Sequence, residues 1–388
     1  MANNRVYYAI QQVSFGKHSG GASRTMKAAH GVQSVGITTT FNLDQVFELG
    51  QLAIYENIEG TPDIEVTLSK VLDGYMPLYC LATADQTSGP QLNKRALARC
   101  FVQLGIWEES FESAGESSSD PTTWVEMSGL YLSSVSYNFP LDDNFSEDIT
   151  LVGNYKVWGA GQQTNDNCAD GGSISYTPNL VAGAFGGNND SPAGSGGVNR
   201  RQNIIFATAD GQTGNPDYSI LPQDIPGIGD GGQKGTAHVS SVTVSTDVGR
   251  EDLFELGKMT PYAKTTTFPI EVTCDVELTT ASGDLINAVD ECTGAGACKE
   301  ATNLNDMPIR IATCEGLRIW LGTKNKLSSV SYGGGDAGGG NATVTYSYST
   351  FNDFVVQHEA ETGKAGVGAS TSGEAWWTER VDNLNPAP

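Results

Sequence analysis

The chain repeats itself at an offset of about half its length. Phe-Glu-Leu-Gly at residues 47–50 returns at residues 254–257, an offset of 207 in a chain of 388 residues. After a slip of one residue, Ile-Glu-Val-Thr at 64–67 faces the same four letters at 270–273. A repeat of this length indicates that one structural unit occurs twice. Further residues match at the offset of 207: Val32, Ser34, Val35, Thr39, Tyr55 and Pro62 face Val239, Ser241, Val242, Thr246, Tyr262 and Pro269.

A second match fixes the order of the two copies. Leu-Ser-Ser-Val-Ser-Tyr at 132–137 returns at 327–332, now at an offset of 195, so the second copy is shorter between the two matches. Loops absorb such changes more readily than strands do. The repeat predicts five segments: an N-terminal arm 1–29, a first module 30–158, a Gly/Asn/Ser-rich inter-module segment 159–235, a second module 236–360 and a C-terminal tail 361–388.

Within each copy, apolar and polar residues alternate with a period of two. This pattern is typical of strands with one buried face. It is clearest over residues 64–69 and 270–278, and it precedes each Phe-Glu-Leu-Gly over 35–43 and 242–248. Later strands are predicted at Gly129–Phe139, Ile149–Trp158, Lys326–Tyr332 and Thr343–Thr350.

Short helices are predicted beside these strands. Residues 44–50 read as one helical turn, with Asp44 as its cap and Gly50 as the left-handed residue that ends it, and the second copy repeats this at Gly257. Flanking helices are predicted at Leu92–Phe101 and Asp284–Cys292. The fold class is therefore mainly β: two tandem β-sandwich or barrel modules, each with a short flanking helix, plus long Gly-rich loops.

Charge and composition argue against several classes of protein. Asp and Glu number 45 against 22 Lys and Arg, a net charge of −23, which disfavours binding of nucleic acid through its phosphates. The 47 glycines and only 17% charged residues disfavour a helical bundle. The N-terminus shows no basic region followed by an apolar stretch, and no run of about 18 apolar residues occurs. We expect a soluble protein made in the cytosol, with no membrane partner.

Motifs for catalysis or cofactor binding are weak. The Gly-rich run at 227–232 matches a dinucleotide signature formally, but Pro226 precedes it and no helix pattern follows. The four histidines are scattered, and the seven cysteines are odd in number and irregularly spaced. Free thiols are expected, although Cys292 and Cys298 could close a small loop. We predict no catalytic residue, no cofactor and no metal, and hence no enzyme.

One acidic cluster leaves two interpretations open. Asp142, Asp143, Glu147 and Asp148 could hold a calcium ion through carboxylate oxygens, but the usual Asp-x-Asp-x-Asp-Gly loop is missing. A solvated hairpin end is the favoured reading.

The first module resembles a known family. The run TTTFNLDQVFELGQLAIYENIEGTPDIEVTLSKVLDG, followed by LYLSSVSYNFPLDDNFSEDITLVGNYKVW, is similar to the tail-tube and major tail proteins of tailed bacteriophages. The second module shares the resemblance more weakly, and the inter-module segment does not share it. The resemblance implies six-fold rings that stack into a hollow tube through which the genome passes. A duplicated module implies three chains in each pseudo-six-fold ring, against six chains for a single module.

The predicted function is therefore structural: a tail tube subunit of the virion, made and assembled in the host cytoplasm. Double-stranded DNA would pass the acidic lumen without specific binding, and sheath, baseplate or tail terminator proteins are the other expected partners. Alternatives are a baseplate hub, a capsid decoration protein, or a β-sandwich glycan-binding or adhesin module. The predicted assembly or core anchors, with Phe47 and Phe254 expected first of all in the core, are Phe47, Leu49, Gly50, Phe254, Leu256, Gly257, Tyr137 and Tyr332.

Overall fold

The computed structural model describes residues 6, 8–18, 26–50, 52, 54–85, 91–108, 121–160, 196–206, 218–225, 228, 238–280, 283–284, 286, 305–335 and 340–359. The Cys292–Cys298 pair, the C-terminal tail and nearly all of the predicted helix at Asp284–Cys292 lie outside these residues. Among the described helices, none is long and apolar enough to span a membrane.

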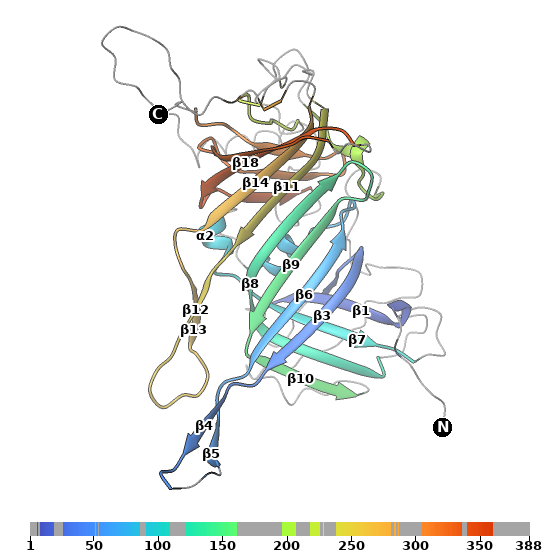
Figure 1. Ribbon diagram of the computed structural model, residues 1–388. Helices are drawn as coiled ribbons and strands as arrows, with labels where there is room; N and C mark the ends of the chain where they lie inside the picture. Colours follow the sequence, from blue (N-terminus) through green and yellow to red (C-terminus); the bar gives the residue numbers. More distant parts are fainter. Residues whose placement is uncertain are drawn as a thin grey trace, which may run out of the picture.

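The predicted mainly β class is confirmed by one large antiparallel sheet (Figure 1). Eight of its strands follow one another side by side and make up what we term the main sheet. The sheet stays open rather than closing into a barrel, because within the described residues it ends at β3 on one side and at β17 on the other. In spatial order its strands are β3 (Val32–Thr40), β6 (Asp63–Val71), β9 (Ser146–Gly153), β8 (Thr123–Pro140), β11 (His238–Asp247), β14 (Glu271–Thr279), β18 (Thr343–Phe351) and β17 (Lys326–Gly333).

The order of the strands follows the sequence repeat. The first four strands carry the first copy and the last four carry the second, so β8 and β11 meet where the copies join. The β-bulges also fall at matching positions. The register of β3 on β6 shifts between Val32 and Ser34, and that of β11 on β14 shifts between Val239 and Ser241, at the offset of 207. The β8 and β17 pairings shift at Leu132/Ser134 and Leu327/Ser329, at the offset of 195.

Strand β8 is long enough to serve two groups of strands. Its C-terminal half lies between β9 and β11, whereas its N-terminal half pairs with β7 (Arg99–Ile106) and β10 (Tyr155–Ala160). Strand β7 continues to β1 (Gln11–Lys17), which pairs with β2 (Met26–Ala28). A separate three-stranded sheet contains β15 (Arg310–Ala312), β16 (Leu317–Trp320) and β19 (Val355–His358). The predicted strand Ile149–Trp158 is thus two strands, β9 and β10.

The core lies on one face of the main sheet. Alternate residues such as Val66, Leu151, Val244 and Val276 are fully buried there, as the period of two predicted. Buried apolar residues from both copies, from β15 and β16 and from the short helix α1 (Leu78–Ala82) form one contiguous cluster. Burial of this apolar surface is the main force that holds the two copies together.

The helices differ in part from the prediction. Helix α2 covers only Leu92–Arg95, and strand β7 begins at Arg99 inside the predicted helix Leu92–Phe101. Cys100, Val102 and Leu104 are buried in β7, so sheet pairing prevails over local helix propensity there. Helix α1 (Leu78–Ala82) is fully buried and no helix was predicted at that position.

The predicted helical turns at Phe-Glu-Leu-Gly are wrong. Both segments are the ends of β-hairpins: β4 (Leu43–Phe47) with β5 (Ile54–Glu59), and β12 (Arg250–Leu253) with β13 (Ala263–Thr266). Figure 1 shows both hairpins projecting beyond the same end of the main sheet. The expected left-handed glycines are confirmed, since φ is +96° at Gly50 and +89° at Gly257. Glycine favours this conformation, which here serves a hairpin turn rather than the end of a helix.

Candidate assembly surface

Within the part of the chain that the structure describes, the two outer strands of the main sheet each have an unpaired edge. There β3 pairs with β6 alone and β17 pairs with β18 alone, whereas every strand between them is paired on both sides. Their side chains are correspondingly open to solvent: β3 has no buried residue, and neither has β17. An exposed strand edge offers a row of backbone donors and acceptors to another strand.

These edges have buried counterparts inside the chain. Because β8 matches β17 and β11 matches β3 in the repeat, the β8–β11 junction shows how such edges pair. There Val242 lies opposite Phe139, Val244 opposite Tyr137 and Thr246 opposite Val135. Past the end of the strand, the Val248 N–H donates to the Ser133 carbonyl at 2.6 Å.

Two tyrosines show the difference most directly. Tyr137 in β8 has no exposed surface, and its hydroxyl donates to Glu147 Oε1 at 2.7 Å. Tyr332, its counterpart in β17, is 53% exposed. On the other edge Phe41 is 69% exposed, whereas its counterpart Val248 is fully buried. Both open edges therefore present residues whose counterparts are buried at the internal junction.

The remaining predicted anchors lie at the hairpin tips, and the expectation that Phe47 and Phe254 belong to the core is wrong. They are 61% and 59% exposed, and Leu49 and Leu256 are completely exposed. A Cβ added at Gly50 or Gly257 would meet no atom within 4 Å. The tips lie outside the core because the hairpins extend past the sheet, beyond the reach of its buried face. The structure thus presents two equivalent apolar tips to solvent at one end of the molecule.

The face of the main sheet opposite the core is polar and acidic. One row across it pairs Ser69, Asp148, Ser136, Ser245 and Thr273 in register. Serine and threonine dominate the other rows, with carboxylates but almost no basic side chains. Along these rows the described acidic residues are Asp63, Glu65, Asp148, Asp247, Glu271, Asp275 and Glu277, and Lys326 at one end is the basic residue among them.

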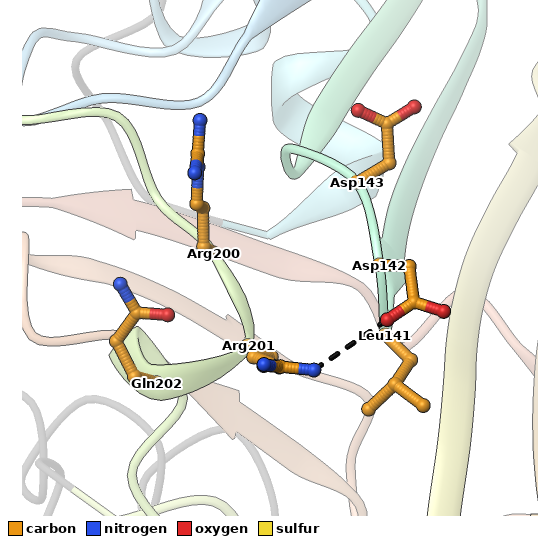
Figure 2. A pocket seen from close by; sticks show the side chains of 6 residues that line it. All are labelled: Leu141, Asp142, Asp143, Arg200, Arg201 and Gln202. Atoms are coloured by element: carbon orange, nitrogen blue, oxygen red, sulfur yellow. Dashed lines mark hydrogen bonds and ion pairs between the residues drawn. The ribbon is translucent and has the colours of Figure 1, made fainter.

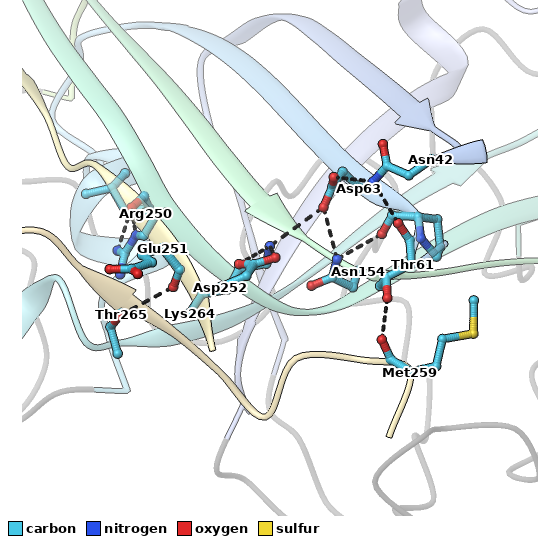
Figure 3. A network of polar contacts seen from close by, with 12 residues as sticks. Asn42, Thr61, Asp63, Asn154, Arg250, Glu251, Asp252, Met259, Lys264 and Thr265 are labelled. Atoms are coloured by element: carbon cyan, nitrogen blue, oxygen red, sulfur yellow. Dashed lines mark hydrogen bonds and ion pairs between the residues drawn. The ribbon is translucent and has the colours of Figure 1, made fainter. Parts of the chain in front are cut away.

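A polar network holds the second hairpin against the first copy (Figure 3). Lys264 Nζ in β13 contacts both carboxylate oxygens of Asp252 at 2.7 Å and Asp63 Oδ1 at 3.8 Å. Only 8% of the Lys264 side chain is exposed. The Thr61 hydroxyl donates to the Met259 carbonyl near the tip of the hairpin. Contacts between the copies thus extend beyond the strand pairing into the hairpin.

Arg250 anchors the base of the same hairpin. Its guanidinium donates to the Leu132 and Ala96 carbonyls, at 2.5 and 2.6 Å from Nη2, and lies 5.1 Å from the ring centroid of Tyr131. Burial lowers the pKa of Arg250 to about 10, which still leaves it charged at neutral pH. The base of the second hairpin is therefore fixed to the first copy by charge-assisted hydrogen bonds.

The acidic cluster at 142–148 does not converge on a cation. Asp142 and Asp143 lie exposed in a turn, but Glu147 is fully buried, which corrects the expectation of a wholly solvated hairpin end. Its carboxylate accepts from the Leu78 and Tyr79 amides at 2.6 and 2.9 Å, at the start of α1. Burial raises the pKa of Glu147, and these hydrogen bonds oppose the rise in part. Within the described residues, no group of three or more potential ligands could hold a metal.

A shallow pocket beside this turn offers little for ligand binding. It has a volume of about 200 Å³ and is lined by Leu141, Asp142, Asp143, Arg200, Arg201 and Gln202 (Figure 2). Its one ion pair, Arg201 to Asp142 at 3.5 Å, is largely exposed. The lining holds two arginines and two aspartates, so its formal charges balance.

The chain has no match among family models or curated proteins. It is similar to several solved components of contractile particles. The cap that terminates the tube of the anti-feeding prophage is 13% identical, with a TM-score of 0.30 over 42% of this chain and 95% of that one. The sheath/tube terminator of an extracellular contractile injection system, PVC, is 14% identical, with a TM-score of 0.31 over 41% of this chain and 100% of that one. At these TM-scores the likeness establishes neither fold nor function.

Proposed function

We propose that this protein is a tail tube subunit of a phage or phage-like particle, and that three chains close each ring. The observation that supports this best is the pair of open edges on the main sheet. Each edge matches in sequence and position a strand that is already paired at the β8–β11 junction. The two edges differ, so β17 of one chain would pair with β3 of the next in a head-to-tail contact. Such contacts generate a closed ring when the rotation between neighbouring chains is an integral fraction of a full turn.

The internal junction predicts the register of the contact between chains. Applying the offsets of 207 and 195 places Ile37 of one chain opposite Tyr332 of the next, and Thr39 opposite Val330. The Phe41 N–H would then donate to the Ser328 carbonyl, as Val248 does to Ser133. This pairing buries the half-exposed apolar residues of both edges.

In such a ring the polar face of the main sheet lines the lumen. Its carboxylates repel phosphate, and its short serine and threonine side chains leave the bore open. A genome can therefore pass without being held. Each of the two copies of the repeat would contribute four strands to the wall.

The exposed hairpin tips then serve to stack the rings. Phe47 and Leu49 at one tip and Phe254 and Leu256 at the other lie at the same end of the sheet, so each ring presents them to the next (Figure 1). Apolar side chains this exposed favour association with another surface.

Electron microscopy of the purified protein tests the proposal directly. Two-dimensional averages of end-on views should show hollow rings with three-fold or pseudo-six-fold symmetry, and side views should show stacks. A single closed ring that never stacks favours a baseplate hub. Dispersed monomers across salt and protein concentration would contradict the proposal, and the glycan-binding module would be examined next.

A further inference from the structure

The two hairpins occupy equivalent places in the repeat but differ in what covers them. Every residue of β4 and β5 in the first hairpin is exposed. In β12 and β13 of the second hairpin, only Glu251 is exposed and Lys264 is buried. The second hairpin contacts the first copy of the repeat through the polar network of Figure 3. No described residue of this chain covers the strands of the first hairpin.

The residues of that network have no equivalents on the first hairpin. At the offset of 207, the first hairpin has Gln45 at the position of Asp252 and Asn57 at the position of Lys264. Asp63, the second carboxylate near Lys264, falls at the one-residue slip between Pro62 and Ile64, and so has no counterpart in the second copy. The ion pairs that fix the second hairpin therefore cannot form around the first.

Apolar residues occupy the positions equivalent to one polar contact of the second hairpin. In that contact Thr61 donates to the Met259 carbonyl, and the equivalent residues are Phe268 and Leu52. Phe268 is 50% exposed and Leu52 is completely exposed. More exposed apolar side chains line the strands of the first hairpin: Leu43, Val46, Ile54, Tyr55 and Ile58. Both sides of this equivalent junction are thus apolar and lack a partner within the described chain.

We infer that the first hairpin of one chain packs beside Phe268 of a neighbouring copy, so that ion pairs hold this junction within a chain and apolar contacts hold it between chains. The inference rests on the proposed ring, in which the second copy of one chain precedes the first copy of the next. The occupant is a second copy of this chain, because the internal junction already shows the matching contact.

The chemical difference has a consequence for assembly. If the first hairpin of another chain took the place of the second, Asp63 would lose its cation, because Asn57 is equivalent to Lys264. Beside Phe268, in contrast, the first hairpin can bury Leu52. The apolar junction thus distinguishes contacts between chains from contacts within one. Salt screens ion pairs but not apolar contact, so rings should persist in 1 M NaCl.

Paired cysteines provide the test. In a background with serine at Cys168, Cys292, Cys298 and Cys314, the variant Leu52→Cys with Phe268→Cys is oxidised under conditions that give rings. We expect covalent dimers and trimers on a non-reducing gel. Thr61→Cys with Met259→Cys is the matched control and should close within one chain, leaving the monomer band with its thiols consumed. Each single-cysteine variant should stay monomeric.

The same samples are viewed by electron microscopy, which separates the possible failures. Rings that form without a Leu52–Phe268 cross-link would overturn this inference and leave the proposed function standing. A cross-link within single chains at high dilution would overturn it as well. Absence of rings from the wild-type protein would overturn both. As a second measurement, Phe268→Thr, which installs the residue of the first copy, should raise the concentration needed for rings about tenfold or more.

Discussion

The internal β8–β11 junction and the two open edges are made of the same repeated sequence, yet they differ in nearly every physical property. At the junction Val242, Val244 and Tyr137 are buried and paired in register. On the edges their counterparts Val35, Ile37 and Tyr332 are half-buried or exposed. The difference in burial arises because β8 and β11 each have a neighbouring strand on that side, whereas β3 and β17 are the outer strands of the main sheet. One chain thus contains both a completed junction and the two halves of an incomplete one.

The largest effect is expected from a charge placed on an open edge. Tyr332→Lys should abolish ring formation, because pairing with β3 would bury an unpaired ammonium group, and lysine on an edge strand blocks pairing. The isolated chain should keep its free energy of unfolding within about 0.5 kcal/mol, since Tyr332 is exposed. Light scattering and denaturant unfolding measure the two effects. Tyr8→Lys, at another exposed tyrosine, is the control and should assemble normally; rings of Tyr332→Lys would refute the edge pairing.

Acid should weaken the closed interior of the chain. His358 in β19 is buried near Lys70, Arg318, Asp73 and Glu315, and burial first, then the Lys70 charge, lowers its pKa from 6.5 to about 3. A lowered pKa in the folded state gives stability that is complete above the unfolded pKa and is lost as the pH falls. Between pH 7 and 5 this histidine should therefore cost about 2 kcal/mol of unfolding free energy.

The stability contribution of Glu147 changes with pH in the opposite direction. Its raised pKa gives stability that is complete below the ordinary value and is lost as the pH rises. The contribution of His358 is therefore read as the difference between wild type and His358→Asn at pH 7 and pH 5. The variant should lose much less stability on acidification. An equal loss in both proteins would contradict the assignment to His358.

Removing one hydroxyl from each repeated tyrosine compares the two regions at the same position. Tyr137→Phe should cost about 2 kcal/mol, because the buried Glu147 carboxylate loses a donor at 2.7 Å. Tyr332→Phe should change the unfolding free energy by less than about 0.5 kcal/mol. Chemical denaturation of the unassembled chain measures both. Equal costs would mean that the internal junction is no more tightly packed than the open edge.

The smallest effect on stability is expected at the hairpin tips. Phe47→Ala and Phe254→Ala should each change the unfolding free energy by less than about 0.5 kcal/mol, against about 3–5 kcal/mol for a buried phenylalanine. If the tips stack the rings as proposed, tubes of these variants should be shorter or absent while single rings persist. A loss of several kcal/mol of unfolding free energy in either variant would instead place that phenylalanine in the core.

Local sequence was sufficient for the elements whose cause is local. Alternation predicted β6, β14, β17 and β18 closely, because a strand with one buried face must alternate. The left-handed backbone at Gly50 and Gly257 was also predictable, since glycine in a repeated turn signals a positive φ. Their use in a hairpin rather than at a helix end was not, because both endings need the same backbone conformation.

Burial depended on the tertiary structure. Tyr137 and Tyr332 sit in the same six letters, and nothing within those letters distinguishes the buried tyrosine from the exposed one. Phe47 and Phe254 look like core residues in sequence, yet the hairpins carry them past the end of the sheet. The burial of Glu147 depends on the amides of α1, which lie 68 and 69 residues away in the chain. The repeat alone determined that one unit occurs twice and that its strands alternate; only the fold decided which edges stay open, because burial is set by neighbours in space.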